Sequence, residues 1–230
     1  MTFTIDCQGK TTREINRALR DAIAAGHRDI RVAEPDARHN LAVALVEPVR
    51  VTFEGSVGYY CGGMMDGAHV EVRGSTGWGA AESMMSGTLV IDGNAGSGVG
   101  ASIRGGTVVV RGEAAARAGV SMKGGTLIIG SRCGYMAGFM MQRGRIIICG
   151  DGGDALADSM YEGVVFVGGK IASLGNDAVV EEPTAEDQAV LADLLSTYGI
   201  LAPPAFRKVV SGHKLWNFDK KDLEIWKAAL

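Results

Sequence analysis

The chain has 230 residues, 47% of them hydrophobic, and a formal net charge of −3 at pH 7. This length and apolar content are typical of one long domain with appendages. The near-neutral charge and the lack of a basic stripe argue against binding to nucleic acid or to a membrane surface.

The residues after Met1 show no basic stretch followed by an apolar one, so we expect no secretory signal. The sequence contains no run of about 18 apolar residues, so we expect no transmembrane helix. We therefore expect a cytoplasmic protein.

The first 45 residues (1–45) predict a small α/β cap. Phe3–Asp6 is typical of a short strand, and Thr11 or Thr12 can cap a helix over residues 12–25 that stops at Gly26. Ile30-Arg31-Val32 predicts a second strand. An atypical terminal unit of this kind can cover the open strand edges at the end of a solenoid.

The central part of the chain, residues 46–182, repeats one pattern every 19 residues. A small residue recurs in the column Gly55, Gly74, Gly93, Gly112, Ser131, Gly150 and Gly169. A second column is rich in methionine: Met65, Met84, Ile103, Met122, Met141, Met160 and Val179. A third column begins each short apolar run: Val51, Val70, Leu89, Val108, Leu127, Ile146 and Val165. The pattern predicts an all-β solenoid, a parallel β-helix of about seven coils stacked about 4.8 Å apart.

Alternation within each strand separates inward from outward positions. The first and third residues of each apolar run are apolar in every coil, so we expect them to fill the interior, with methionine as a second wall. The residues between them should face outward, and five of these are apolar: Val90, Val109, Ile128, Ile147 and Phe166. An apolar strip of this kind is rarely exposed to solvent. Either the C-terminal segment or another protein covers it, and we take these residues as interface candidates.

Residues 183–230 predict a helical C-terminal extension. Thr184 is an N-cap signal for a helix over about 185–197, and a last helical stretch is expected over 221–230. Between them the tail carries aromatic and basic residues, among them Phe206, Trp216 and Phe218. The tail either folds back on its own solenoid or docks on a partner, for which aromatic anchors are typical.

The sequence offers little chemistry. The four cysteines (Cys7, Cys61, Cys133, Cys149) form no Cys-x-x-Cys pair and are expected to be free thiols. Asp151 and Asp154 can form an acid/base pair, but such residues more often belong to a polar turn. The loop Gly93–Gly100 is not followed by a helix, which excludes a dinucleotide site. We therefore expect no catalytic, cofactor-binding or metal-binding residue in this chain.

The segments Gly87-Thr-Leu-Val-Ile-Asp-Gly, Gly106-Thr-Val-Val-Val-Arg-Gly and Gly125-Thr-Leu-Ile-Ile-Gly resemble the glycine-motif domain at the C-terminus of the large subunit of glutamate synthase. The same domain forms the β-helix subunit of formylmethanofuran dehydrogenase. The resemblance covers about residues 40–182 and implies a right-handed β-helix. The tail over 206–219 looks like the stand-alone β-helix subunit, the third subunit, of N-methylglutamate synthase (methylamine–glutamate N-methyltransferase).

The resemblance implies a non-catalytic structural subunit of a transferase complex that converts methylamine and glutamate into N-methylglutamate and ammonia. It implies a flavin-barrel partner that holds FMN, with or without an iron–sulfur cluster, and a glutaminase-like amidotransferase partner. One alternative is the β-helix subunit of formylmethanofuran dehydrogenase, also structural. Another is a stand-alone β-helix enzyme or sugar-binding protein. The hexapeptide-repeat acyltransferases, whose coil has about 18 residues, are a weaker rival.

Overall fold

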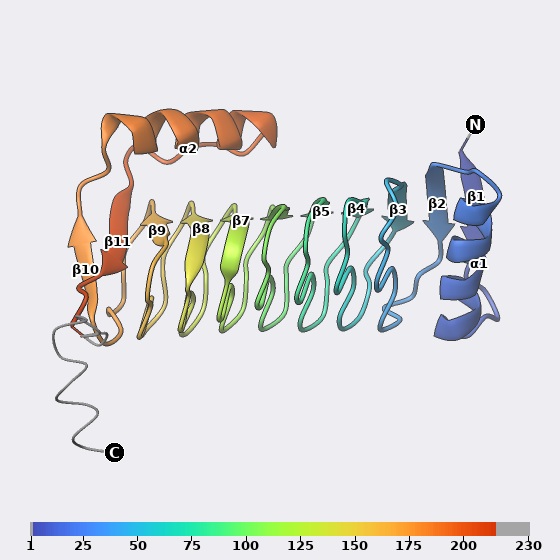
Figure 1. Cartoon of the computed structure of the whole chain (residues 1–230), viewed down its shortest axis with the longest axis horizontal. Coiled ribbons are helices and arrows are strands. Elements are labelled where there is room, and N and C mark those ends of the chain that lie inside the picture. Colours follow the sequence, from blue (N-terminus) through green and yellow to red (C-terminus); the bar gives the residue numbers. More distant parts are fainter. Residues whose placement is uncertain (1, 215–230) are drawn as a thin grey trace, which may run out of the picture.

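A computed structural model of the protein describes residues 2–214. Its main body is the expected parallel β-helix, a stack of coils that each contribute one strand to a single sheet (Figure 1). Neighbouring strands pair in parallel with a register of 19 residues, as Val70 with Leu89. Seven strands follow one another in this way: β3 (Arg50–Glu54), β4 (His69–Val72), β5 (Thr88–Ile91), β6 (Thr107–Val110), β7 (Lys123–Ile129), β8 (Arg143–Ile148) and β9 (Val164–Val167).

The N-terminal elements extend this sheet at one end. Strand β1 (Phe3–Asp6) pairs in parallel with β2 (Asp29–Ala33), and β2 pairs with β3. Helix α1 (Thr12–Ala24) joins β1 to β2 and begins with a capping box, in which Thr11 and Glu14 satisfy each other's backbone amides. The predicted strands and helix are confirmed. The chain after β2 also stacks on the next coil, because the Ala44 amide donates to the Gly63 carbonyl at 2.8 Å.

The interior is built from the predicted columns. The inward residues of β3 to β9 are buried in every coil, as are the methionine-column residues from Met65 to Met160. Each such side chain contributes about 1.5–3 kcal/mol by leaving water. The columns are chemically uniform because equivalent residues stack directly on one another.

Small residues are required in two columns for different reasons. In the Gly55 column, Gly74 has no left-handed backbone, but a Cβ there would lie 2.6 Å from the Ser56 amide nitrogen of the preceding coil. Close stacking of coils therefore requires glycine. In the column Gly62, Ala81, Gly100, Gly119, Gly138 and Ala157, every residue has a positive φ between 58° and 72°. These residues share a left-handed turn.

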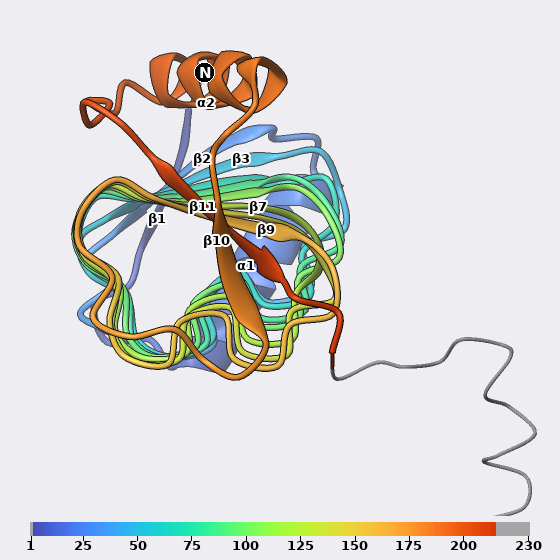
Figure 2. The same ribbon diagram turned by 90° about the vertical axis from the view of Figure 1, so that its left-hand side faces the viewer.

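The C-terminal end departs from the repeat. Strand β10 (Ala178–Glu181) leads into helix α2 (Ala185–Thr197), which lies across the outer face of the sheet (Figures 1 and 2). The chain then returns as β11 (Arg207–Ser211), which inserts between β9 and β10 and pairs antiparallel with both. Helix α2 has the predicted bounds, whereas the strand β11 lies between the two predicted helical stretches and was not predicted. The final stretch 221–230, with Trp216 and Phe218 before it, lies outside the described residues.

Candidate protein interface

The outward positions of the sheet form one continuous row that changes character halfway. Register places Thr4, Arg31, Thr52 and Glu71 in line with Val90, Val109, Ile128, Ile147 and Phe166. In the second half the side chains from Val109 to Phe166 have no exposed surface. They are buried by Leu191 and Leu195 of α2, with Tyr198 and Phe206 packed alongside.

This burial corrects the interface prediction. The residues Val90, Val109, Ile128, Ile147 and Phe166 offer almost no surface to a partner, because the C-terminal segment of the same chain covers them. Phe206 also packs internally, edge to face on Phe166 with ring centroids 6.5 Å apart. The alternative of a tail folded back on its own solenoid is confirmed for Phe206 to Ser211.

Helix α2 is fastened at both ends by polar contacts. At its start, Thr184 and Asp187 form a capping box, and Lys208 Nζ of β11 lies 3.0 Å from Asp187 Oδ2. Burial tends to raise the pKa of Asp187, but hydrogen bonds from Thr184 and Lys208 outweigh it and the pKa is lowered. At its end, Arg111 Nη1 of the β-helix donates to the Tyr198 carbonyl at 2.7 Å. The cover is therefore tied to the β-helix by charge-assisted bonds as well as by apolar packing.

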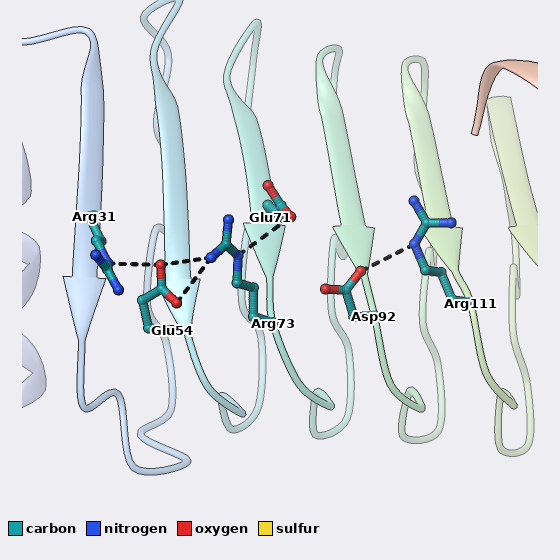
Figure 3. A network of polar contacts seen from close by, with 6 residues as sticks. All are labelled: Arg31, Glu54, Glu71, Arg73, Asp92 and Arg111. Carbon is teal, nitrogen blue, oxygen red and sulfur yellow. Dashed lines mark hydrogen bonds and ion pairs between the residues drawn. The ribbon is translucent and has the colours of Figure 1, made fainter. Parts of the chain in front are cut away.

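The first half of the outward row is polar, and no helix of the described residues lies over it (Figure 1). Glu54 lies between Arg31 Nε at 2.8 Å and Arg73 Nη1 at 3.2 Å, and Arg73 also approaches Glu71 at 3.7 Å (Figure 3). These groups line a surface hollow over β1 to β4. The hollow is lined by three Arg and three acidic side chains, so it offers no concentrated charge of one sign for a ligand.

A second surface lies on the side of the β-helix opposite α2 (Figure 2). It is formed by the return segments, the stretches of twelve residues that precede the apolar run of each strand: 57–68, 76–87, 95–106, 114–125, 133–144 and 152–163. The segments 114–125 and 133–144 include the first residues of β7 and β8. Of the thirteen exposed large hydrophobic side chains in the described part of the chain, eight lie in these segments: Tyr59, Tyr60, Met64, Trp78, Met85, Tyr135, Met140 and Tyr161. We call this surface the return face.

Two rings of the return face, Tyr59 and Trp78, form a stack with His39. His39 lies 4.2 Å from Tyr59, and Tyr59 lies 5.2 Å from Trp78, with interplanar angles of 16° and 12°. His39 Nδ1 accepts a hydrogen bond from the Tyr59 amide at 2.9 Å, which fixes the first ring. The Trp78 side chain ends the stack and is 59% exposed. Pre-ordered aromatic side chains with open surface are typical of interface anchors.

The residues considered for chemistry serve the coil stack instead. Asp151 Oδ1 accepts from the Lys170 amide at 2.7 Å, and Asp154 Oδ1 accepts from Ser173 Oγ at 2.9 Å, both in the next coil. The four cysteines are free and buried. Burial raises the pKa of Cys61 and of Cys133 to about 12, so both stay protonated thiols at neutral pH.

Residues 2–214 contain no group of three or more His, Cys, Asp or Glu side chains placed to hold a metal ion. Neither α1 nor α2, the helices of this part of the chain, is long and apolar enough to cross a membrane.

The sequence prediction missed the return face. Its large side chains fill only some of the coils in each column, so they do not form the full columns that reveal the interior. The available signal was an incomplete aromatic column, in which Tyr59, Trp78 and Tyr135 alternate with the small residues Ser97 and Ala116.

These features define the class: a parallel β-helix with an internally covered sheet and an aromatic surface in its turns. No protein-family model matches the sequence. The chain is 49% identical to Protein GlxC of Rhizobium meliloti (strain 1021) over 219 residues, 94% of this chain and 96% of the relative. It therefore belongs to the GlxC family, which confirms the family resemblance predicted from the repeats.

A solved structure shares the fold. It is a chain of the formyltransferase/hydrolase complex (FhcABCD) from Methylorubrum extorquens, determined with methylofuran, and superposes with a TM-score of 0.70. The match covers 87% of this chain and 89% of the other, at 23% sequence identity. At that identity, the likeness concerns the β-helix fold alone.

Proposed function

We propose that this chain is a non-catalytic structural subunit of a glutamate synthase-like complex. The complex we propose is N-methylglutamate synthase, which forms N-methylglutamate and ammonia from methylamine and glutamate. The observation that carries the proposal is membership of the GlxC family over almost the whole chain. The specific reaction is proposed because residues 206–219 resemble the β-helix subunit of that enzyme.

A structural role agrees with what the side chains do. Asp151 and Asp154 bond to the next coil, and the cysteine thiols are buried with raised pKa values. The interior is filled by apolar columns rather than by polar groups around a cavity. A rigid, elongated body of this kind is suited to holding two other subunits in a fixed arrangement.

The partners in this proposal are a flavin-barrel subunit that carries FMN, with or without an iron–sulfur cluster, and a glutaminase-like amidotransferase subunit. The return face is the surface we assign to contact with them. Its exposed tyrosine, tryptophan and methionine side chains are residue types enriched at protein interfaces.

Purification of the tagged chain from its native source, under mild conditions, tests the proposal. Mass spectrometry should find a flavin-barrel chain and a glutaminase-like chain in fixed ratio, and the visible spectrum should show flavin absorption. The assembly should form N-methylglutamate from methylamine and glutamate, while the isolated chain should not. A colourless, solitary protein, or activity of the chain alone, would contradict the proposal.

A further inference from the structure

Charge is segregated along the return face. Segments 57–68 and 76–87 carry one acidic residue each, Asp66 and Glu82, and no Lys or Arg. The three middle segments, 95–106, 114–125 and 133–144, carry Lys and Arg, with Glu and Asp absent from all three. The last segment, 152–163, is again purely acidic. A protein with a net charge of −3 therefore has a basic band across the middle of this face.

Most of this basic band is not neutralised by the chain itself. It consists of Arg104, Arg117, Lys123 and Arg143, all of them exposed. Arg143 pairs with Glu162 of the next coil at 3.3 Å. The other three form no ion pair with a described residue. On the sheet side, Arg31, Arg73 and Arg111 are paired, whereas Arg50 and Arg145 form no ion pair with a described residue.

The unpaired cations lie between two groups of large side chains. Segments 95–106 and 114–125 consist mainly of glycine, alanine and serine around Arg104, Arg117 and Lys123. The preceding coils carry Trp78 and Met85, and the following coil carries Tyr135 and Met140, all exposed. A strip of small residues with three cations thus separates two groups of exposed apolar side chains.

We propose that the basic band binds an acidic segment of a sister subunit, a helix or loop with two or more carboxylates. This inference rests on the proposed function and adds to it the place and charge of the contact. Aspartate or glutamate side chains would pair with Arg104, Arg117 and Lys123, while the flanking aromatic and methionine side chains exclude water around them. Three cations on a small-residue strip are too few for nucleic acid, which demands many phosphate contacts.

Charge reversal tests the contact in the native assembly. Arg104→Glu with Lys123→Glu replaces attraction by repulsion and is expected to weaken binding of the sister subunit at least tenfold. The control Arg13→Glu with Arg17→Glu makes the same change in net charge on exposed sites of α1 and should change binding less than twofold. Circular dichroism confirms that both variants fold. Equal binding by both variants would overturn the inference.

A carbodiimide cross-link on the unmodified assembly gives a second test without any variant. The reagent joins a carboxylate to a lysine amine only when the two are in contact. Lys123 should be joined to an aspartate or glutamate of a sister subunit, as identified by mass spectrometry. A flavin-barrel assembly in which Lys123 joins no partner residue overturns the inference and leaves the proposed function standing. A cross-link from Lys123 to an unrelated protein contradicts the proposed function and supports the acidic contact.

Discussion

The two halves of the outer sheet face belong to one stack of parallel strands but differ in their outward side chains. Over β2 to β4 the outward residues are Arg31, Thr52 and Glu71, and the face is open. Over β5 to β9 they run from Val90 to Phe166, and α2 lies on them. The same arrangement of parallel strands thus supports either a solvent-exposed face or a buried one. The outward side chain of each strand determines which of the two is formed.

The same change occurs in the neighbouring column, just after each strand. Glu54, Arg73, Asp92 and Arg111 alternate in charge over the open half and its border. The next three members are small, Gly130, Cys149 and Gly168. At Gly168 a Cβ would lie 2.3 Å from Pro203 Cγ of the segment after α2. At Gly168 the column is therefore small where the segment after α2 needs room.

A buried charge in the covered half should give the largest effect. Ile147→Asp places a carboxylate without a partner between the sheet and α2, and it should lower the free energy of unfolding by about 3–5 kcal/mol. Urea denaturation followed by circular dichroism measures the change. The Ile147→Asp substitution should also expose apolar surface that binds a hydrophobic dye.

The matched control lies in the same row of the open half. Glu71→Ile exchanges charge for an apolar group where α2 does not reach, and loses only an exposed pair with Arg73. It should change stability by about 0–1 kcal/mol. If both substitutions cost the same, α2 does not cover the row in solution.

The start of α2 should give an intermediate effect that depends on pH. Asp187→Asn weakens the capping box with Thr184 and removes the charge opposite Lys208, at an expected cost of about 1–2 kcal/mol at pH 7. The pKa of Asp187 is lower in the folded protein than in the unfolded chain. Its stabilising contribution is therefore present above a pH of about 4 and is lost as the pH falls through the lowered value.

Hydrogen exchange of the α2 amides between pH 7 and pH 3 measures this dependence. The unmodified protein should lose protection in α2 below pH 4, whereas the Asp187→Asn variant should already be less protected at pH 7 and change less. Glu186→Gln removes a neighbouring charge without touching Thr184 or Lys208, and it should behave like the unmodified protein. An identical pH profile for the Asn variant would show that Asp187 does not fasten the helix.

The comparison also shows what the sequence could predict. The β-helix followed from full columns, because stacked coils force equivalent residues into equivalent surroundings. The helices followed from local signals, Thr11 with Glu14 and Thr184 with Asp187. These features need no knowledge of distant contacts.

The parts that the sequence did not predict depend on contacts between distant segments. The insertion of β11 between β9 and β10 joins residues about 40 positions apart, such as Val209 and Val165, and reverses the strand direction. The apolar strip was visible from the sequence, but nothing local to it distinguished α2 from a foreign protein as its cover. The return face was missed because its aromatic column is incomplete: Ser97 and Ala116 stand between Trp78 and Tyr135.

Substitutions of the arginines near the border between the halves should have the smallest effect on the free energy of unfolding. Arg73→Gln breaks exposed pairs with Glu54 and Glu71, so it should cost about 0–1 kcal/mol at low salt and almost nothing in 0.5 M salt, an ionic strength of about three times the physiological value. Arg111→Gln, two coils further along the same column, also loses a hydrogen bond to the Tyr198 carbonyl and should cost about 1 kcal/mol. Thermal unfolding of both variants at low and high salt measures the difference. If the Arg111 effect also vanishes in salt, its bond to the end of α2 adds nothing and the cover is held there by apolar packing alone.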